Sequence, residues 1–200
     1  GSIYYEDTSL KATMDTMLQY WQTEQPSSNN WYFNQIGEPK LMGQYLILMD
    51  YLGSERIPQV LLNTAIARLS NNGGNPSSQT GANRIDVALH HMYRACLTKD
   101  SDLLNEAMTY IYSPIELTTG GIQYDNSYTQ HGRQLYTGSY GNVFLTGITK
   151  ASMYAVDTEY AIPSDRLQIL SNLVKDSYAT IFRGEYMLFN PLGRASTRPN

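Results

Sequence analysis

The chain has 200 residues and a formal net charge of −4, with 42% hydrophobic and 16% charged residues. These values are typical of a folded globular protein, and they argue against a disordered chain or a nucleic-acid binder held by bulk positive charge. No apolar run is long enough to span a bilayer.

Helical periodicity runs along most of the chain that follows Gly1 and Ser2, which resemble the remnant of a cleaved tag. Seven segments share the three-and-four apolar spacing of an amphipathic helix. They are residues 9–24, 39–53, 57–69, 85–96, 101–112, 141–156 and 167–181. Cys96 falls on one of the apolar stripes and is expected to be buried. Strand-like alternation is nearly absent, so the sequence predicts an all-α fold of helical hairpins.

Polar segments rich in Gly, Asn, Ser and Thr separate these helices. The longest cover residues 71–80 and 113–141, and shorter irregular segments are expected at 25–37 and from 184 to the end. Long loops inside a compact domain are usually functional, so these segments are where candidate site residues are expected.

Trp31 and Tyr32 are adjacent aromatic residues in a polar segment. Two neighbouring rings cannot easily face one core, so at least one is expected to face a groove where a sugar ring could stack. The alternative is a loop anchored by a buried tryptophan.

Asn83 leads into the predicted helix that begins near Ile85. Asparagine is a favoured helix N-cap, and Asp86 stands at the capping-box position, so on this residue alone a capping role is favoured. The alternative is an amide that donates to a bound carboxylate, assisted by the helix dipole.

His131 and Tyr140 are nine positions apart in a glycine-punctuated stretch without helical periodicity. An imidazole and a phenol are well suited to moving a proton from carbon to a leaving oxygen. The only acid between residues 120 and 150 is Asp125, so the surroundings are locally basic. The alternative is a histidine bonded to backbone and a tyrosine packed under Gly141.

Arg194 and Arg198 are four residues apart, so on a helical turn their guanidinium groups would share a face. Like charges placed this way repel unless an anion lies between them, and the alternative is a solvated basic patch. No cysteine and histidine cluster has the spacing of a zinc site, so neither a metal nor another cofactor is expected.

Four segments together resemble polysaccharide lyase family 8, which contains hyaluronate, chondroitin AC and xanthan lyases. They are residues 30–39 (Asn-Trp-Tyr to Ile-Gly-Glu-Pro), 80–84 (Thr-Gly-Ala-Asn-Arg), 130–141 (Gln-His to Tyr-Gly) and 193–198 (Gly-Arg to Arg). The resemblance places five residues at catalytic positions: Asn83, His131, Tyr140, Arg194 and Arg198. It places Trp31 and Tyr32 on an aromatic substrate-binding patch, where the family usually has two tryptophans.

The resemblance also implies a larger architecture. The family fold is an incomplete α/α toroid followed by antiparallel β-sandwich domains, and residues 3–200 would form part of the toroid. The β-sandwich domains of a parent protein would then be partners of this chain. A secreted or periplasmic location is expected on the same ground.

The family reaction is β-elimination on a uronate-containing acidic polysaccharide of the hyaluronan, chondroitin or xanthan type. The Asn83 amide would stabilise charge on the uronate carboxylate, and Arg194 and Arg198 would hold anionic groups. Tyr140 would take the C5 proton and return a proton to the leaving O4 oxygen, with His131 assisting. The reverse assignment, with His131 as the base, stays open.

A second hypothesis, from another class, is a helical carbohydrate-binding or scaffold domain without activity. It would keep the sugar-binding groove and lack turnover. Neither hypothesis requires nucleic acid or a membrane as a partner.

Overall fold

The computed structural model describes residue 4, residues 7–51 and residues 56–197, without the side chain of Tyr51. The chain folds into two compact units. The first unit consists of Gly1–Asn75 and His90–Leu104, and the second consists of Pro76–Leu89 and Asn105–Asn200.

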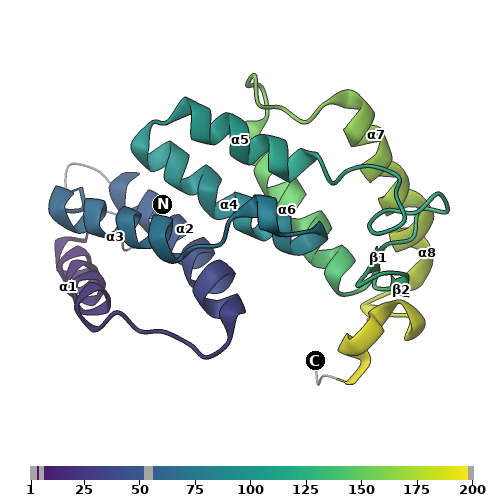
Figure 1. Ribbon diagram of the computed structural model, residues 1–200, viewed down its shortest axis with the longest axis horizontal. Helices are drawn as coiled ribbons and strands as arrows, with labels where there is room; N and C mark the ends of the chain where they lie inside the picture. The colour runs from purple at the N-terminus through teal and green to yellow at the C-terminus, as the bar shows by residue number, and fades with distance from the viewer. Residues whose placement is uncertain (1–3, 5–6, 52–55, 198–200) are drawn as a thin grey trace. The chain divides into compact units, whose positions relative to one another are not determined.

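Helices dominate the described part of the chain (Figure 1). The α-helices are α1 Thr8–Glu24, α2 Glu38–Tyr51, α3 Gln59–Asn72, α4 Gly81–Thr98, α5 Ser101–Tyr112, α6 Tyr140–Ala155, α7 Ser164–Asn172 and α8 Ala179–Ile181. The π-helical turns are η1 Phe33–Gly37 and η3 Leu173–Tyr178, and the 3-10 segments are η2 Pro76–Ser78 and η4 Asn190–Thr197. Two antiparallel hairpins pair β1 Thr129–Gln130 with β2 Gln134–Leu135 and β3 Phe182–Arg183 with β4 Tyr186–Met187.

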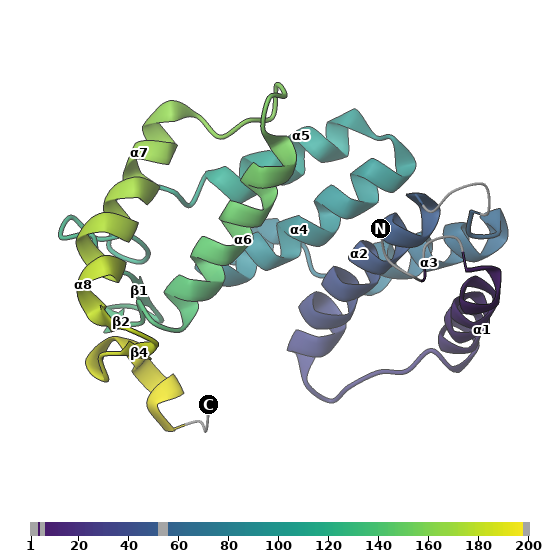
Figure 2. The same ribbon diagram turned by 180° about the vertical axis from the view of Figure 1, so that it is seen from behind.

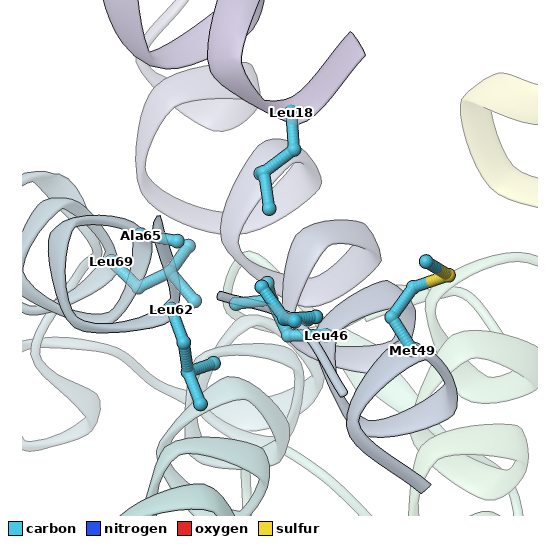
Figure 3. Packing of buried hydrophobic residues seen from close by; sticks show 7 residues of the cluster. Leu18, Leu46, Met49, Leu62, Ala65 and Leu69 are labelled. Atoms are coloured by element: carbon cyan, nitrogen blue, oxygen red, sulfur yellow. The ribbon is translucent and has the colours of Figure 1, made fainter. Parts of the chain in front are cut away.

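The first unit is built around an aliphatic core. Helix α3 contacts both α1 and α2, and Figure 3 shows their side chains meeting. The buried members are Leu18, Leu46, Met49, Ile57, Leu62, Ala65 and Leu69. Each large apolar side chain buried in this way contributes about 1.5–3 kcal/mol, so this cluster holds the three helices together.

The second unit packs the first turns of α4 against α6. Gly147 makes this close approach possible, because a Cβ at that position would lie 2.7 Å from Cγ2 of Ile85. Figures 1 and 2 show the β1–β2 hairpin beside α8. A hydrogen bond of 3.0 Å from Asn126 Nδ2 to Asp176 Oδ2 joins the loop before this hairpin to η3.

The prediction of an all-α fold is confirmed, and each expected helix overlaps an observed one. The segment 113–141 is nevertheless ordered by its own backbone, through bridges that join Ile122 to Leu117 and to Tyr128. The irregular segment expected at 25–37 is also shorter than predicted, because the chain is helical from Trp31 onward. No helix in the described ranges combines the length and apolar character needed to cross a membrane.

The prediction that Cys96 is buried is wrong, because the cysteine is exposed. Its stripe is buried at Met92 and at Ala95, one residue before the cysteine. Near the end of α4 the buried face therefore includes Ala95 and not Cys96.

His90 is a titratable group of the first unit with 0% of its surface exposed. Neither ring nitrogen has a partner in hydrogen-bond geometry. Burial, with smaller contributions from His91 and Arg94, lowers its pKa from 6.5 to about 3, and the Gly74 backbone opposes this shift only weakly. The folded chain therefore holds His90 neutral.

Replacing His90 with phenylalanine should weaken the acid sensitivity of folding. Below pH 6.5 the unfolded chain protonates His90, whereas the folded chain does so only near pH 3. The free energy of unfolding therefore falls as pH drops through this window, by up to about 1.4 kcal/mol per pH unit. Urea unfolding of His90→Phe between pH 7 and pH 4 should show a shallower decline than the unmodified chain.

Met92→Leu is the matched control, because it changes another buried side chain of α4 and removes no titratable group. It should leave the decline of stability with pH unchanged. A His90→Phe variant that loses stability with acid as steeply as the unmodified chain would contradict the neutral, buried state of His90.

Candidate active site

His131 lies in the turn of the β1–β2 hairpin. The pairing of Gln130 with Gln134 closes this turn, and His131 and Gly132 both adopt left-handed backbone conformations, with φ values of 54° and 82°. A left-handed conformation is uncommon for a residue with a side chain and is found in tight turns and at functional sites. The turn leaves the imidazole exposed to solvent.

Three aromatic rings meet at this hairpin. The ring centroids of His131 and Tyr140 are 5.1 Å apart, those of Tyr136 and Tyr140 are 5.2 Å apart, and those of His131 and Tyr136 are 6.0 Å apart. All three pairs are edge-to-face, which is a favourable arrangement for aromatic rings. Tyr136 is 3% exposed, so it forms the buried base on which the two outer rings rest.

Tyr140 is the first residue of α6. The turn before it is tight, because the amides of Ser139 and Gly141 both donate to the Tyr136 carbonyl, at 3.2 and 2.9 Å. This turn therefore fixes the point at which Tyr140 enters the helix.

Two buried tyrosines support this turn from below. The Tyr178 hydroxyl donates to the Thr137 carbonyl at 2.7 Å, and the Tyr128 amide donates to Thr137 Oγ1 at 3.1 Å. Burial raises the pKa of both the Tyr178 and the Tyr128 hydroxyl well above 10. These two phenols stay protonated and act as structural donors, whereas Tyr140 reaches the surface.

Arg194 comes to this site from the C-terminal segment. Its Nη2 donates to the Tyr140 hydroxyl oxygen at 2.6 Å, and the guanidinium carbon lies 5.4 Å from the centre of the Tyr140 ring. A cationic donor strengthens a hydrogen bond and stabilises negative charge on its acceptor. The structure thus brings together His131, Tyr140 and Arg194.

Asn83 is the third residue of α4. The prediction that it caps the helix is wrong, because the helix begins earlier, at Gly81, and the Thr80 carbonyl already accepts from the Arg84 amide. Gly81 adopts a φ of 52° and lies against Gln130, the residue before His131. The turn that carries Asn83 is therefore packed on the strand that leads to the histidine.

Trp31 and Tyr32 belong to the first unit. The other predicted site residues with a described structure belong to the second unit: Asn83, His131, Tyr140 and Arg194. Trp31 is 47% exposed and Tyr32 is partly buried. Their rings lie edge-to-face with centroids 6.2 Å apart, and Phe33, which is 55% exposed, lies 5.8 Å from Tyr32. Trp31 is thus a surface ring that a sugar could stack upon, and not a buried anchor.

Arg198, the second predicted arginine, lies outside the described residues. Within the described ranges, no group of three or more His, Cys, Asp or Glu side chains is placed to hold a metal ion. The polar groups that the second unit gathers are therefore the phenol, the imidazole, the guanidinium and the amides near them.

The sequence pointed to His131, Tyr140 and Arg194 but not to the residues that support them. Tyr136 is the central ring, and Gly193 lies so close to it that a Cβ would overlap the ring. The signal available was a tyrosine at each end of Tyr-Thr-Gly-Ser-Tyr, four positions apart. That spacing does not reveal which of the two rings is buried.

Comparison with known proteins gives the family. The model of polysaccharide lyase family 8, N-terminal alpha-helical domain, matches residues 1–200. The chain belongs to polysaccharide lyase family 8. This confirms the resemblance drawn from the four segments.

The relatives of this family 8 chain are bacterial lyases. It is 41% identical to chondroitinase-AC of Pedobacter heparinus over all of this chain and 28% of that protein. It is 29% identical to hyaluronate lyase HylB of Enterococcus faecalis over 99% of this chain and 22% of that protein. The chain thus spans roughly a quarter of the length of these relatives.

Solved structures show the same fold. A chondroitinase AC lyase determined with oligosaccharides superimposes with a TM-score of 0.93 at 40% identity, over 99% of this chain and 29% of that one. The chondroitin AC lyase of Streptomyces coelicolor superimposes with a TM-score of 0.82 at 23% identity, over 98% and 28% of the two chains.

The close approach of Gly81 to Gln130 should stabilise the fold of this family 8 chain. In Gly81→Ala the new methyl group would overlap Gln130 Oε1 and lie 2.9 Å from the Tyr128 hydroxyl, at a φ that disfavours alanine. We expect the free energy of unfolding, measured in urea, to fall by about 1–3 kcal/mol.

Gly184 is the matched control, because it has a similar φ of 61° and a Cβ there would meet no atom within 4 Å. Gly184→Ala should lower the free energy of unfolding by less than Gly81→Ala, because it shares the strain in φ and not the overlap. Equal losses in the two variants would show that the close approach at Gly81 does not stabilise the fold.

Proposed function

We propose that this chain is the helical part of a polysaccharide lyase that cleaves an acidic, uronate-containing glycan by β-elimination. The observation that carries the proposal is the hydrogen bond from Arg194 to the Tyr140 phenol oxygen, 2.6 Å long, beside the exposed imidazole of His131. Family membership supports the reaction class.

In the proposed reaction the phenolate of Tyr140 removes the proton on C5 of the uronate. The carbanion electrons form the C4–C5 double bond, and the C4–O4 bond breaks. The Tyr140 phenol then returns its proton to the departing O4 oxygen. Arg194, which donates to the Tyr140 oxygen, would stabilise the phenolate that starts the cycle.

The C5 proton is acidic only if the neighbouring carboxylate can accept charge. We propose that the Asn83 side-chain amide stabilises the charge that builds up on this carboxylate. Asn83 lies in the first turn of α4, where the helix amides also favour anions. His131 is exposed and can reach a substrate group while its ring stays in edge-to-face contact with Tyr140. Its proposed role is to assist, and action as the base in place of Tyr140 is the alternative.

The substrate is proposed to be chondroitin or hyaluronan, the polymers after which the relatives are named. A xanthan-type glycan is the alternative substrate. Trp31 and Tyr32 would contribute stacking surfaces for its sugar rings. Because such polymers are too large to enter a cell, we propose that the protein acts after secretion or in the periplasm. We further propose that β-sandwich domains complete the enzyme.

The second candidate function is a carbohydrate-binding domain without turnover. It is favoured by the exposure of Trp31 and Phe33, at 47% and 55%, which would bind sugars even if no chemistry followed. The two functions differ in whether an unsaturated product forms.

A chimera separates these functions. The segment of the Pedobacter heparinus chondroitinase-AC that aligns with this chain would be replaced by this chain, at 41% identity. Ultraviolet absorbance of the new C4–C5 double bond would be followed with chondroitin and with hyaluronan. A folded chimera that binds glycan and forms no product would favour the binding domain.

Within the chimera, Tyr140→Phe should lower kcat by about 100- to 10,000-fold, the usual contribution of a general acid–base group. Binding of the glycan should change little, because the aromatic ring is retained. Tyr154→Phe, at a 60% exposed position on the same helix, is the matched control and should keep full activity.

Tyr140→Phe also tests whether His131 is the base. If His131 removes the C5 proton, Tyr140→Phe should still exchange that proton with deuterium from solvent, although cleavage stops. Absence of both exchange and cleavage would support Tyr140 as the base. Near-normal cleavage by Tyr140→Phe would rule out the proposed mechanism.

A further inference from the structure

Tyr136 is the residue of this site for which the proposed chemistry gives no role. It is 3% exposed, so its ring cannot serve as a surface on which a glycan stacks. Its edge-to-face contacts nevertheless reach both reactive rings, with centroids 6.0 Å from His131 and 5.2 Å from Tyr140.

The C-terminal segment packs on the same ring. Gly193 has a φ of 56°, and a Cβ there would overlap Cδ1 and Cε1 of Tyr136 and lie 3.0 Å from its Cζ. The backbone at residue 193 therefore lies directly on the tyrosine ring. Arg194, the next residue, donates to the Tyr140 hydroxyl.

A second contact fixes how this segment approaches. The Gly138 amide donates to the Pro191 carbonyl at 2.8 Å, and Gly138 lies against Met187 and Leu192. The turn that leads into Tyr140 and the segment that carries Arg194 are thus packed together at two glycines, with Tyr136 between them.

We propose that Tyr136 is a positioning residue for the elimination reaction: its ring is the common support that fixes the imidazole of His131, the phenol of Tyr140 and the guanidinium of Arg194 relative to one another. This inference rests on the proposed function for its catalytic meaning. Its structural content, the restraint of Arg194 on Tyr140, stands on the contacts alone.

The need for such a support follows from exposure. Arg194 is exposed, and an exposed arginine samples many rotamers, so a single hydrogen bond does not hold it in place. Reacting groups must be held to within about 0.5 Å of a productive geometry, and residues behind them provide this precision. The Tyr136 ring supplies this precision by holding the backbone at Gly193, the residue before Arg194.

The test measures the restraint of Arg194 by NMR in the 200-residue chain labelled at arginine. A guanidinium bound to the phenol should rotate slowly about its Nε–Cζ bond and give separate Nη signals, identified by their loss in Arg194→Lys. In Tyr136→Leu we expect the Arg194 guanidinium to rotate at least about tenfold faster, approaching the rate in Tyr140→Phe. A tenfold change in rate corresponds to about 1.4 kcal/mol. Tyr136→Phe keeps the ring, so its Arg194 rotation rate should stay within about twofold of the rate in the unmodified chain.

Tyr124→Leu is the control for loss of a tyrosine, because Tyr124 is 84% exposed in the same long segment. It should leave the rotation of Arg194 unchanged. Circular dichroism of each variant checks that the helices are intact.

A second variant covers the case in which Tyr136→Leu does not fold. Gly193→Ala keeps Tyr136 and places a methyl group against its ring, so the arginine should lose its restraint in the same way. Gly184→Ala is the matched control, because Gly184 has a similar φ of 61° but no atom within 4 Å of the added Cβ. A restrained Arg194 in Gly193→Ala would overturn the proposal, as would a restrained Arg194 in folded Tyr136→Leu.

The chimera described above gives the catalytic readout. Tyr136→Leu should lower kcat by about tenfold or more with KM within about twofold, and Tyr136→Phe should restore the rate. An active chimera in which Tyr136→Leu changes only KM would overturn the positioning role. If the chimera makes no product at all, the proposed function fails, while the NMR result still decides whether Tyr136 restrains Arg194.

Discussion

Close packing of glycine backbone against bulky side chains is the constraint on which the site of the second unit depends. Gly81 lies against Gln130, Gly138 against Met187, and Gly193 against Tyr136. Each contact joins segments far apart in the sequence, and in each a Cβ would overlap its neighbour. The chemical groups meet because the backbone can approach closely at these positions, and two of the three also require a positive φ.

The long segment 113–141 contains one short hairpin, and hydrogen bonds hold the rest of it. A buried backbone polar group needs a partner, and here Tyr178 and Tyr128 provide donors to Thr137 while the chain bridges at Ile122. These buried phenols stay protonated because burial raises their pKa. The site thus separates fixed structural tyrosines from Tyr140, whose oxygen faces a cationic donor.

Much of the fold could be predicted from the sequence because amphipathic spacing is a local property. The helices at 101–112 and 141–156 match α5 and α6 within one residue. Predictions that depended on where a helix begins, or on which of its residues are covered, were less secure. Asn83, taken alone, favoured a cap of α4 but lies inside its first turn, and Cys96 was expected in the core but is exposed.

The sequence by itself determined the helical class, the family through its four ordered segments, and the identity of the polar groups that could move a proton. Only the tertiary structure decided that His131, Tyr140 and Arg194 meet, and that Tyr136 is the buried ring among them. The reason is physical: periodicity reports contacts between near neighbours along a helix. The approach of residue 193 to residue 136 depends on long-range packing and on a left-handed glycine, and neither leaves a periodic trace in the chain.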